Sequence, residues 1–561
     1  MKNMKKWIGV ILMLSLLTSL CACGQLDDVT PGNVEKDNSP TFKIAMAIAD
    51  ITPNRDVYLD GYEAHDASSL AKYPDNFTTD LKARILVVDN GTDRLVFVNL
   101  EMIFSGSGYG YNNLSEYTLD AIAEACQTTR ENVLLSNTHN HQANQFLGDV
   151  EEENILNAVK EAYARLAPAK IGTTTVNTEF GMSRGGNYTV NESEPYDSLM
   201  SIIRFDNAET GEPIGLIYSV PMHGTMFGNG PGLKAKHNLL NCEFTGYTSR
   251  AIEASMAEKN PNFAAMHING FYGNATPFAN GKYYAESEKE MAQNGAAFAK
   301  EILKGYNAIE TKRVTGEIVT NLVKEGIPTN KTNQEFRKQF GDYDNMPLYV
   351  TLGAFGDIGF VGVNYEPFSI IGARLKAESP YRTLMPAGNV NGWNGYIPTK
   401  EVFAKYEKGV VQAECGPSKS PFDADGEEAF YTKVLDSVCD MAGVTLERVP
   451  MEKTGVQDMG KTAVYTYELS GGATLDKLVI SFGQDLRTDC AQDFDLMAFN
   501  SAGEMVFSKT YEGSTVNYLG EFLDGAEVAK VTLAVRTRYG SGEEGVAELD
   551  PQLYGIQFTA K

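Results

Sequence analysis

Hydrophobic residues in the first half of the chain form short runs that end at turn residues. The segments 42–53, 83–90 and 93–101 are strand-like, and the turn residues 89–92 (Asp-Asn-Gly-Thr) predict a hairpin between the last two. Apolar residues recur at helical spacing from 113 to 127, where Asn113 and Glu116 offer a capping-box start. A strand at 133–137 follows. This order predicts a mixed α/β sheet with its site at the C-terminal end of a strand.

The pattern changes after about residue 450. Helical periodicity disappears, and short strand signals separated by Gly, Asp and Ser turns occur at 462–469, 477–483, 494–500, 504–511, 530–538 and 553–560. Such spacing is typical of a β-sandwich. We therefore expect a large mixed-sheet α/β hydrolase domain at 42–450, followed by a small all-β sandwich domain at 451–561.

The N-terminus has the form of a bacterial lipoprotein signal peptide. A basic start precedes an apolar segment from Trp7 to Leu20, which is short for a transmembrane helix. Leu20, two small residues and Cys23 match a lipoprotein cleavage site, so residues 1–23 are predicted to be the signal with Cys23 lipidated. The alternative is a plain signal peptide with incidental cysteines. Residues 24–41 are polar and turn-rich, and are predicted to be a flexible tether.

The amino-acid composition limits the kinds of partner and site that can be expected. The chain has 561 residues, 43% of them hydrophobic and 22% charged, as in globular proteins. Its net charge of −25 disfavours nucleic acid and anionic membrane surfaces as electrostatic partners. The five cysteines after the signal are scattered and lack CxxC spacing, so neither a disulfide framework nor a thiolate metal site is expected. They are interpreted as small buried apolar residues.

The histidines carry the clearest chemical signal. All six lie in the first half of the chain, at positions 65, 139, 141, 223, 237 and 267. His139 and His141 follow the apolar strand at 133–137. Residues i and i+2 of a strand face the same way, so both imidazoles are predicted to point into one cavity. The alternative is a pair of satisfied polar residues at a strand end.

A second apolar strand, 214–220, runs into His223. Catalytic zinc usually has three protein ligands and an open position, and it lowers the pKa of bound water towards neutrality. Two strand ends that carry histidines suit such a composite site, with carboxylates as further ligands that spacing alone does not choose. His237 remains an alternative to His223, although it does not end an apolar strand.

Several blocks of the large domain resemble the neutral, non-lysosomal ceramidase family, which are zinc amidohydrolases that cleave the N-acyl bond of ceramide. The blocks span roughly residues 42–415 in the family's order: ADITP, DGY, NVLLSNTHNH, GMSRGGN, DSLMSIIRFDNAETGEPIGLIYSVPMHGT, INGFYGNATP, GFVGVNYEPFSIIGARLKAESP and NVNGWNGYIPTKEVF. Each block alone is a weak signal, whereas the ordered set is specific.

The resemblance implies a role for particular residues. It places Zn²⁺ on His139, His223, Glu366 and Tyr396 and leaves His141 to handle a proton beside the metal. Thr276 stands where the family has a serine proposed to take part in catalysis. Arg184 lies in an Arg/Asn-bearing loop, and we expect Arg184 and Tyr396 to stabilise a developing oxyanion.

The chain also departs from the family pattern. Asn274 stands where an Asp is usual, and Thr276 where many members have Ser. Asn140 and Gln142 replace Thr and Ser beside the histidines, and the sequence before Glu366 is VNY instead of a Pro-Gly pair. Metal binding is therefore better supported by the sequence than ceramide as the substrate.

The resulting expectation is a zinc amidohydrolase, lipid-anchored through Cys23 at the extracytoplasmic face of a bacterial membrane. It would cleave ceramide or a related amphiphilic N-acyl lipid into a fatty acid and a sphingoid base. One alternative is a zinc hydrolase of another amide or ester, such as an N-acyl amino acid or a cell-wall component. Another is a non-catalytic lipid- or glycan-binding lipoprotein, which the loss of charge at Asn274 keeps open.

Overall fold

The computed structural model describes residues 40–59, 61, 68–106, 113–185, 191, 194–227, 237–329, 344–407 and 417–561. The chain divides after Pro40, and residues 41–561 form one unit. The predicted signal peptide with Cys23, nearly all of the predicted tether, and residues Asp60, Tyr62, His65 and Cys415 lie outside the described residues. No helix in the described ranges is long and apolar enough to cross a membrane.

A nine-stranded sheet forms the centre of the large domain. Its spatial order is β11 (Ala264–Asn269), β10 (Pro213–Val220), β9 (Leu199–Asn207), β7 (Ala167–Asn177), β1 (Lys43–Asp50), β4 (Lys82–Asp89), β5 (Arg94–Leu100) and β6 (Val133–Asn137), with β13 (Lys312–Arg313) paired to β7. The pairs β5–β6 and β10–β11 are parallel, whereas the other neighbours are antiparallel. The predicted mixed sheet and the β4–β5 hairpin are thus confirmed.

The two ends of this sheet approach each other. Strand β11 packs against β1, β4, β5 and β6, although it lies at the opposite end of the strand order. Side chains from both ends, including Leu86, Phe97, Ile217 and Met266, share one buried apolar cluster. This curvature brings the C-terminal ends of β6 and β10 into the same region.

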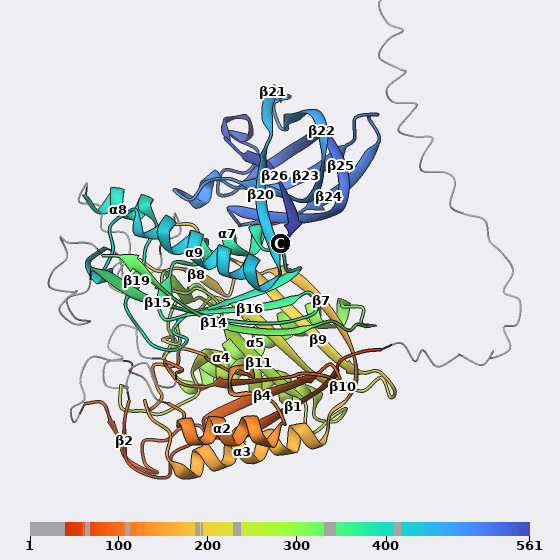
Figure 1. The fold of residues 1–561 in the computed structure, drawn as a ribbon. Coiled ribbons are helices and arrows are strands. Elements are labelled where there is room, and N and C mark those ends of the chain that lie inside the picture. Colours follow the sequence, from red (N-terminus) through yellow and green to blue (C-terminus); the bar gives the residue numbers. More distant parts are fainter. Residues whose placement is uncertain are drawn as a thin grey trace, which may run out of the picture. The chain divides into compact units, whose positions relative to one another are not determined.

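Helices cover the sheet in pairs. Helix α3 (Asp149–Ala164) packs on β1 and β4 and beside α2 (Glu116–Ala125), as Figure 1 shows below these strands. On the other part of the sheet, α4 (Glu243–Met256) packs against α5 (Glu288–Ala308) and β11. The helix predicted at 113–127 is confirmed, but its cap is Ser115, whose hydroxyl accepts from the backbone N–H of Thr118. Asn113 instead donates to the Gln145 carbonyl.

A second layer of short elements completes the large domain. One sheet has the order β14 (Ile318–Pro328), β15 (Asn345–Phe355), β16 (Ile358–Val363) and β18 (Thr383–Ala387). Three small sheets have two strands each. They pair β2 (Val57–Tyr58) with β3 (Leu70–Ala71), β8 (Gly181–Ser183) with β12 (Ala275–Pro277), and β17 (Glu366–Pro367) with β19 (Tyr396–Ile397). The described residues also form helices α7 (Ser369–Glu378), α8 (Lys400–Glu407) and α9 (Gly426–Met441), with short 3₁₀ helices at Arg130–Asn132, Pro417–Lys419, Arg487–Asp489 and Val546–Glu548.

The C-terminal region is all-β, as predicted. Its seven strands form one continuous sheet in the order β20 (Val444–Pro450), β26 (Gln552–Ala560), β22 (Ala463–Ser481), β25 (Tyr518–Arg538), β23 (Ala491–Phe499) and β24 (Met505–Tyr511), with β21 (Glu452–Asp458) paired to β22. The register of the long strands β22 and β25 shifts along their length. Such irregularities let strands bend, so that the sheet folds over an apolar core of its own. The predicted boundary after residue 450 falls between β20 and β21.

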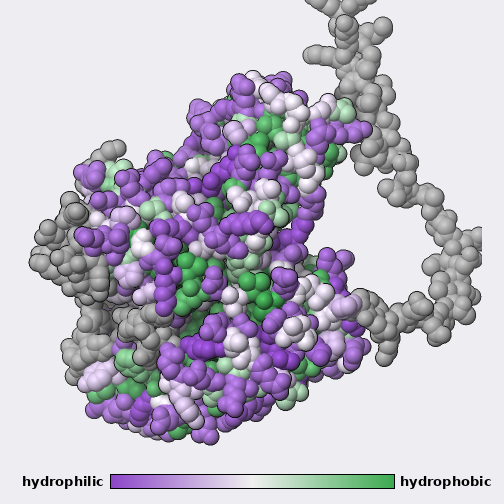
Figure 2. Space-filling view, viewed as in Figure 1, coloured by the Kyte–Doolittle hydropathy of each residue, from purple (hydrophilic) through white to green (hydrophobic). Residues whose placement is uncertain are grey.

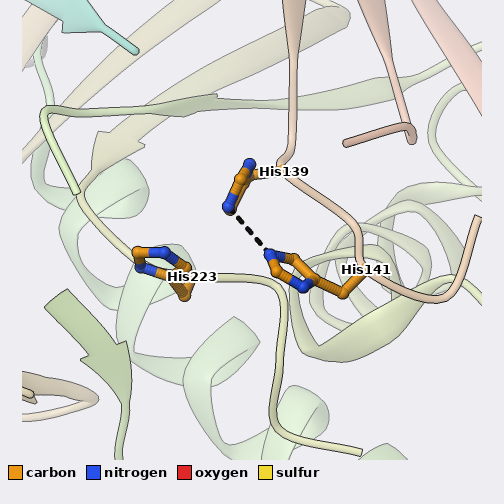
Figure 3. A group of neighbouring side chains, drawn as sticks. All are labelled: His139, His141 and His223. Atoms are coloured by element: carbon orange, nitrogen blue, oxygen red, sulfur yellow. Dashed lines mark hydrogen bonds between the residues drawn. The ribbon is translucent and has the colours of Figure 1, made fainter. Parts of the chain in front are cut away.

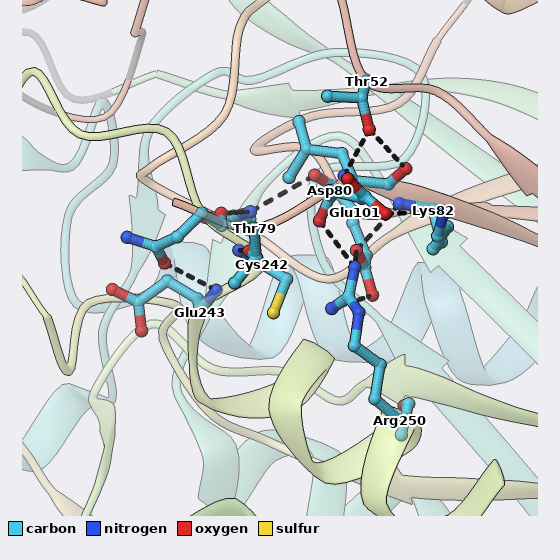
Figure 4. Close-up of polar contacts among 12 residues, drawn as sticks. Thr52, Thr79, Asp80, Lys82, Glu101, Cys242, Glu243 and Arg250 are labelled. Carbon is cyan, nitrogen blue, oxygen red and sulfur yellow. Dashed lines mark hydrogen bonds and ion pairs between the residues drawn. The ribbon is translucent and has the colours of Figure 1, made fainter. Parts of the chain in front are cut away.

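A buried ionic network joins α4 to β4 and β5. The Arg84 guanidinium donates to Glu101 at 2.6 Å and to both oxygens of Glu253, at 2.6 and 3.1 Å. Arg250 reaches the second Glu101 oxygen at 3.1 Å, and the Lys82 backbone N–H donates to the same oxygen at 2.8 Å (Figure 4). Arg84 and Glu101 are fully buried, so their charges depend on each other for solvation.

The described cysteines fit the sequence interpretation. Cys126, Cys242, Cys439 and Cys490 are all buried and unbonded to one another. Burial raises the pKa of each thiol, to about 11 for Cys126 and about 12 for the other three. They therefore remain protonated at neutral pH and are poor metal ligands or nucleophiles.

We expect Arg84→Met to lower the free energy of unfolding by about 3–5 kcal/mol, because it removes the buried cation shared by Glu101 and Glu253 and leaves Glu101 with Arg250 alone. Chemical denaturation measures this change. Lys43→Met on the exposed face of β1 is the control and should change stability by less than about 0.5 kcal/mol. Equal, small effects of the two substitutions would contradict a structural role for the network.

Candidate metal centre

Three histidines from two strand ends meet in the large domain. His139 and His141 lie in the loop after β6, and His223 lies three residues after the end of β10. One ring nitrogen from each of the three lies within 4.8 Å of the other two (Figure 3). His139 and His223 are buried, whereas His141 is half-buried. His139 and His141 thus direct their rings to a shared region, as expected, and His223 joins them there.

The two loops are joined directly through their backbones. Asn140 and Gly224 form a parallel β-bridge, in which the Gly224 N–H donates to the His139 carbonyl at 3.1 Å and the His141 N–H donates to the Gly224 carbonyl at 3.0 Å. A Cβ atom at position 224 would lie 2.3 Å from that His139 oxygen. Only glycine permits the two chains to come this close.

The expectation that a strand aligns His139 and His141 is wrong. β6 ends at Asn137, so His139 and His141 do not alternate on a strand. His139 instead has φ of 55°, in the left-handed region that residues with a Cβ rarely adopt. The Asn137 side chain accepts from the His139 N–H at 3.0 Å and supports this turn. A strained turn therefore directs both imidazoles to the same point, which fits the tendency of such strain to occur at functional sites.

Backbone carbonyls fix the protonation of all three rings. The Nδ1 atoms of His139, His141 and His223 lie 3.0, 2.7 and 2.8 Å from the carbonyls of residues 103, 61 and 275, respectively. A carbonyl only accepts, so each Nδ1 carries the proton and donates it. Each Nε2 therefore presents its lone pair to the shared space, which is the arrangement found in metal-binding histidines.

The Nε2 atoms of His139 and His141 lie 2.9 Å apart. Two lone pairs at this distance repel unless a proton or a metal cation lies between them. Burial, the largest cause, lowers the pKa of His139 to about 3 and that of His141 well below its ordinary value, which disfavours a proton. A cation bound by one of the two nitrogens would also remove the repulsion, because it takes up that nitrogen's lone pair.

Glu366 adds a carboxylate to the group. Its two oxygens lie 3.9 Å from His139 Nε2 and 3.2 Å from His223 Nε2. His223 Nε2 and Glu366 Oε2 are both buried without a well-formed hydrogen bond among the described residues. Burial raises the pKa of Glu366, but the two histidines and a hydrogen bond from Tyr396 outweigh it and hold the pKa well below its ordinary value. The buried donor set of imidazoles and carboxylate therefore fits a divalent metal such as Zn²⁺.

The strand pair β17–β19 explains how Tyr396 reaches the group. Glu366 and Tyr396 are direct partners in this parallel pair, although they are 30 positions apart in the chain. Arg184 is also buried, and its charge lowers the pKa of all three imidazoles in addition to burial, the largest cause. The structure thus brings the predicted residues Glu366, Tyr396 and Arg184 together with the histidines.

Thr276 lies on the strand pair beside the site, and Asn274 lies in the turn just before it. Thr276 is buried in β12, opposite Met182, and no hydrogen bond in the described ranges joins its hydroxyl to the imidazoles. The Asn274 amide donates to the Ser183 hydroxyl and the Pro195 carbonyl, each at 3.2 Å, and accepts from the Ser369 N–H at 2.7 Å. An aspartate could not make both donations. Asn274 therefore links three segments around the site.

The other two described histidines, His237 and His267, do not join this group. His267 is buried in β11, where its Nε2 donates to the Val220 carbonyl at 3.1 Å and its ring stacks on Tyr218. His237 is half-buried in a turn and is not one of the clustered residues, so the structure favours His223 over it. His65 lies outside the described residues.

Two residues of the site had been assigned no role from the sequence. Asn389, with φ of 54°, donates from Nδ2 to Glu366 Oε1 at 3.0 Å. The Tyr272 ring stacks on His139 with 4.4 Å between ring centres and meets His223 edge-on at 5.1 Å. The Asn- and Gly-rich turn around Asn389 is the one sequence signal that could have indicated it; nothing in the sequence marks Tyr272 as a neighbour of the histidines.

Comparison with solved structures identifies the fold. Neutral ceramidase from Pseudomonas aeruginosa matches 90% of this chain and 94% of its own, with a TM-score of 0.53 and 16% identity. A structure described as ceramidase complexed with C2 matches the same shares, with a TM-score of 0.51 and 16% identity. No protein-family model and no curated protein sequence matches the chain. The chain therefore has a ceramidase-like fold at low sequence identity.

We expect Gly224→Ala to weaken metal binding at least tenfold, because the added Cβ must push the His139 and His223 loops apart. Competition with a chelator measures the change. Gly455→Ala is the matched control, since a Cβ at that position meets no atom within 4 Å. Unchanged metal affinity in Gly224→Ala would show that the backbone bridge does not hold the site.

His267 predicts a pH-dependent stability difference. Burial lowers its pKa to about 4, so acid protonates the unfolded chain first and the folded protein loses stability as the pH falls from about 6.5. His267→Phe keeps the stacking on Tyr218 but loses a hydrogen bond, and should cost about 1 kcal/mol at pH 7. Between pH 6.5 and 4.5 the free energy of unfolding of the wild type should fall by up to about 1.4 kcal/mol more per pH unit than that of the variant. The wild type should therefore be the less stable of the two at the acidic end of this range. A difference independent of pH, measured by denaturation, would contradict this assignment.

Proposed function

We propose that the protein is a zinc-dependent amidohydrolase that cleaves the N-acyl bond of ceramide or a related N-acyl lipid. The observation that carries the proposal is the convergence of His139, His223 and the Glu366 carboxylate in a buried space, with the Nδ1 protons of both rings committed to backbone carbonyls. The ceramidase-like fold, over 90% of the chain, supports the choice of an N-acyl lipid as substrate.

His139, His223, Glu366 and Tyr396 would hold the metal. The first three already converge within the described geometry, and Tyr396 is hydrogen-bonded to Glu366. A bound Zn²⁺ would supply a Lewis acid that polarises the scissile carbonyl and a water molecule. Asn389 and the backbone carbonyls of Ile103 and Ala275 would hold the ligands in orientation, as partners outside the first coordination shell commonly do.

His141 is the group best placed to move protons. It is the most exposed of the three histidines, and its Nδ1 proton is held by the Gly61 carbonyl, so its Nε2 is free of a proton at neutral pH. That nitrogen would accept a proton from the attacking water and return it to the amide nitrogen as the C–N bond breaks. The products are a fatty acid and an amine, and no further reactant is required.

Arg184 and Tyr396 would act on the developing oxyanion. A buried guanidinium next to the three imidazoles supplies a fixed positive charge in a region with little water. Thr276 would act through its hydroxyl at the edge of the substrate position. Its place one residue beyond Ala275, whose carbonyl binds His223, supports this role.

The predicted lipid anchor gives the activity a location. Lipidation of Cys23 would hold the enzyme at the extracytoplasmic face of a bacterial membrane, near amphiphilic substrates. The packing of Asn274 supports an active enzyme over a binding lipoprotein, because its amide is needed to tie three segments together and its lack of charge has a structural reason.

The His139→Ala variant is expected to lose the metal and all measurable hydrolysis, because it removes one of the converging lone pairs. His141→Ala should keep about one metal per chain and lose at least about 100-fold in kcat, the range for losing a general base. Elemental analysis and hydrolysis of a fluorogenic ceramide, run on the same samples with and without chelator, measure both effects. Metal retained in His139→Ala together with full activity would contradict the site. Metal lost in His141→Ala would make His141 a ligand.

A substrate panel tests the acyl-lipid assignment. Turnover should require a long acyl chain, and N-acyl amino acids with short chains should be cleaved at least about tenfold more slowly, since each buried methylene contributes about 0.8 kcal/mol. Equal turnover of short- and long-chain amides by a metal-loaded sample would assign the same centre to another amide or ester. No turnover of any substrate by that sample would favour a binding protein.

A further inference from the structure

Helix α7 connects the candidate metal centre to the C-terminal sheet. It has ten residues, so its axis is about 15 Å long, and it begins two residues after the Glu366–Pro367 strand. Buried side chains occur on all of its faces: Ser369, Ile370, Ile371, Gly372, Ala373, Leu375, Ala377 and Glu378. Because the helix is buried on all faces, the protein segments packed around it determine its position.

The N-terminal end of α7 is fixed to the site. The Ser369 N–H donates to Asn274 Oδ1 at 2.7 Å, and the Gly273 N–H donates to the Pro367 carbonyl at 2.8 Å. A Cβ at Gly273 would lie 2.3 Å from the Glu366 carbonyl oxygen. Displacement of the helix along its axis would therefore move Glu366 or break these contacts.

The C-terminal end of α7 is capped by a lysine from the C-terminal sheet. Lys477, in β22, donates to the Lys376 carbonyl at 3.2 Å and to the Ser379 carbonyl at 2.9 Å. Carbonyls at a helix end lack partners within the helix, and the dipole there favours a nearby cation. The Lys477 side chain is 1% exposed and also lies over the Phe522 ring, so the contact excludes water.

Three further contacts hold the same end of the helix. The buried Glu378 carboxylate accepts from Tyr554 Oη of β26 at 2.6 Å and is paired with Arg448 of β20. Gly520 of β25 lies against Ala377 so closely that a Cβ would be 2.2 Å from the Ala377 carbonyl oxygen. Four strands of the C-terminal sheet thus contact the last turn of α7.

We propose that the C-terminal sheet positions the metal centre, acting through α7, with Lys477 as the principal positioning residue. The inference rests on the proposed metal centre and assigns the C-terminal sheet to its scaffold. The large domain offers its own contact to α7, because Lys376 pairs with Asp197 at 2.7 Å. If that contact were sufficient, the sheet would be dispensable for Glu366, and the variants below distinguish the two cases.

The test compares Lys477→Met with Lys530→Met in the full chain. Methionine keeps the length and apolar stem of Lys477 but removes its donor, and Lys530 is an exposed lysine of the same sheet. Tyr554→Phe, which removes only the hydroxyl bound to Glu378, is a milder second variant should Lys477→Met fail to fold. The readouts are the Zn²⁺ dissociation constant, by competition with a chelator, and amide hydrogen exchange across residues 364–379.

Lys477→Met should weaken Zn²⁺ binding about tenfold, and Tyr554→Phe about threefold. Losses of this size are expected when a residue that supports the metal ligands from outside the coordination shell is removed. Lys530→Met should bind Zn²⁺ like the wild type. Amide hydrogen exchange should increase from the C-terminal end of α7 back to residues 366–372. An increase confined to residues 376–379, or unchanged Zn²⁺ affinity in both variants, would overturn the inference. A wild type without metal would refute the proposed function instead, and the extent of exchange would still decide whether the sheet reaches Glu366.

Discussion

The candidate site depends on the commitment of three imidazole Nδ1 protons to backbone carbonyls. Because a carbonyl cannot donate, the protonation state of each ring is fixed by the main chain and not by solvent. The Nε2 lone pairs of His139, His141 and His223 then converge in a buried space that favours a cation. Burial lowers the pKa of these rings, so protons do not compete effectively for the same nitrogens near neutral pH.

The fold supplies the backbone that makes this possible. The curved nine-stranded sheet brings the ends of β6 and β10 together, and the Asn140–Gly224 bridge joins their loops. Asn140 also donates to the Glu101 carbonyl, so the loop rests on the buried ionic network of Arg84, Glu101 and Arg250. The face of the molecule in Figure 2 is mainly hydrophilic, with hydrophobic residues in smaller patches, and many apolar side chains lie buried in the cores.

Sequence patterns predicted helices and strands better than the contacts between segments that are far apart in the chain. Local patterns were sufficient for the β4–β5 hairpin, helix α2 and the C-terminal strands β23, β24 and β26, because each depends on residues close in the chain. They did not predict β20 and β21, and the segments 462–469 and 477–483, expected as two strands, form the single strand β22. The cap of α2 was assigned to Asn113 instead of Ser115, since both residue types cap helices and the choice depends on the tertiary contacts of Asn113. Spacing identified His139, His141 and His223, but a strand was the wrong reason for the convergence of the first two. Glu366 and Tyr396 came from family resemblance alone, because no local pattern reports a parallel pair between residues 30 positions apart.

The most direct test of the account is anomalous diffraction from a crystal of the zinc-loaded protein, recorded on both sides of the zinc absorption edge. The account predicts one strong peak about 2.0–2.1 Å from the Nε2 atoms of His139 and His223 and within reach of a Glu366 oxygen. A peak bound through Nδ1 would contradict the role of the backbone carbonyls. No peak at the histidines, in a crystal soaked with excess zinc, would contradict the metal centre itself.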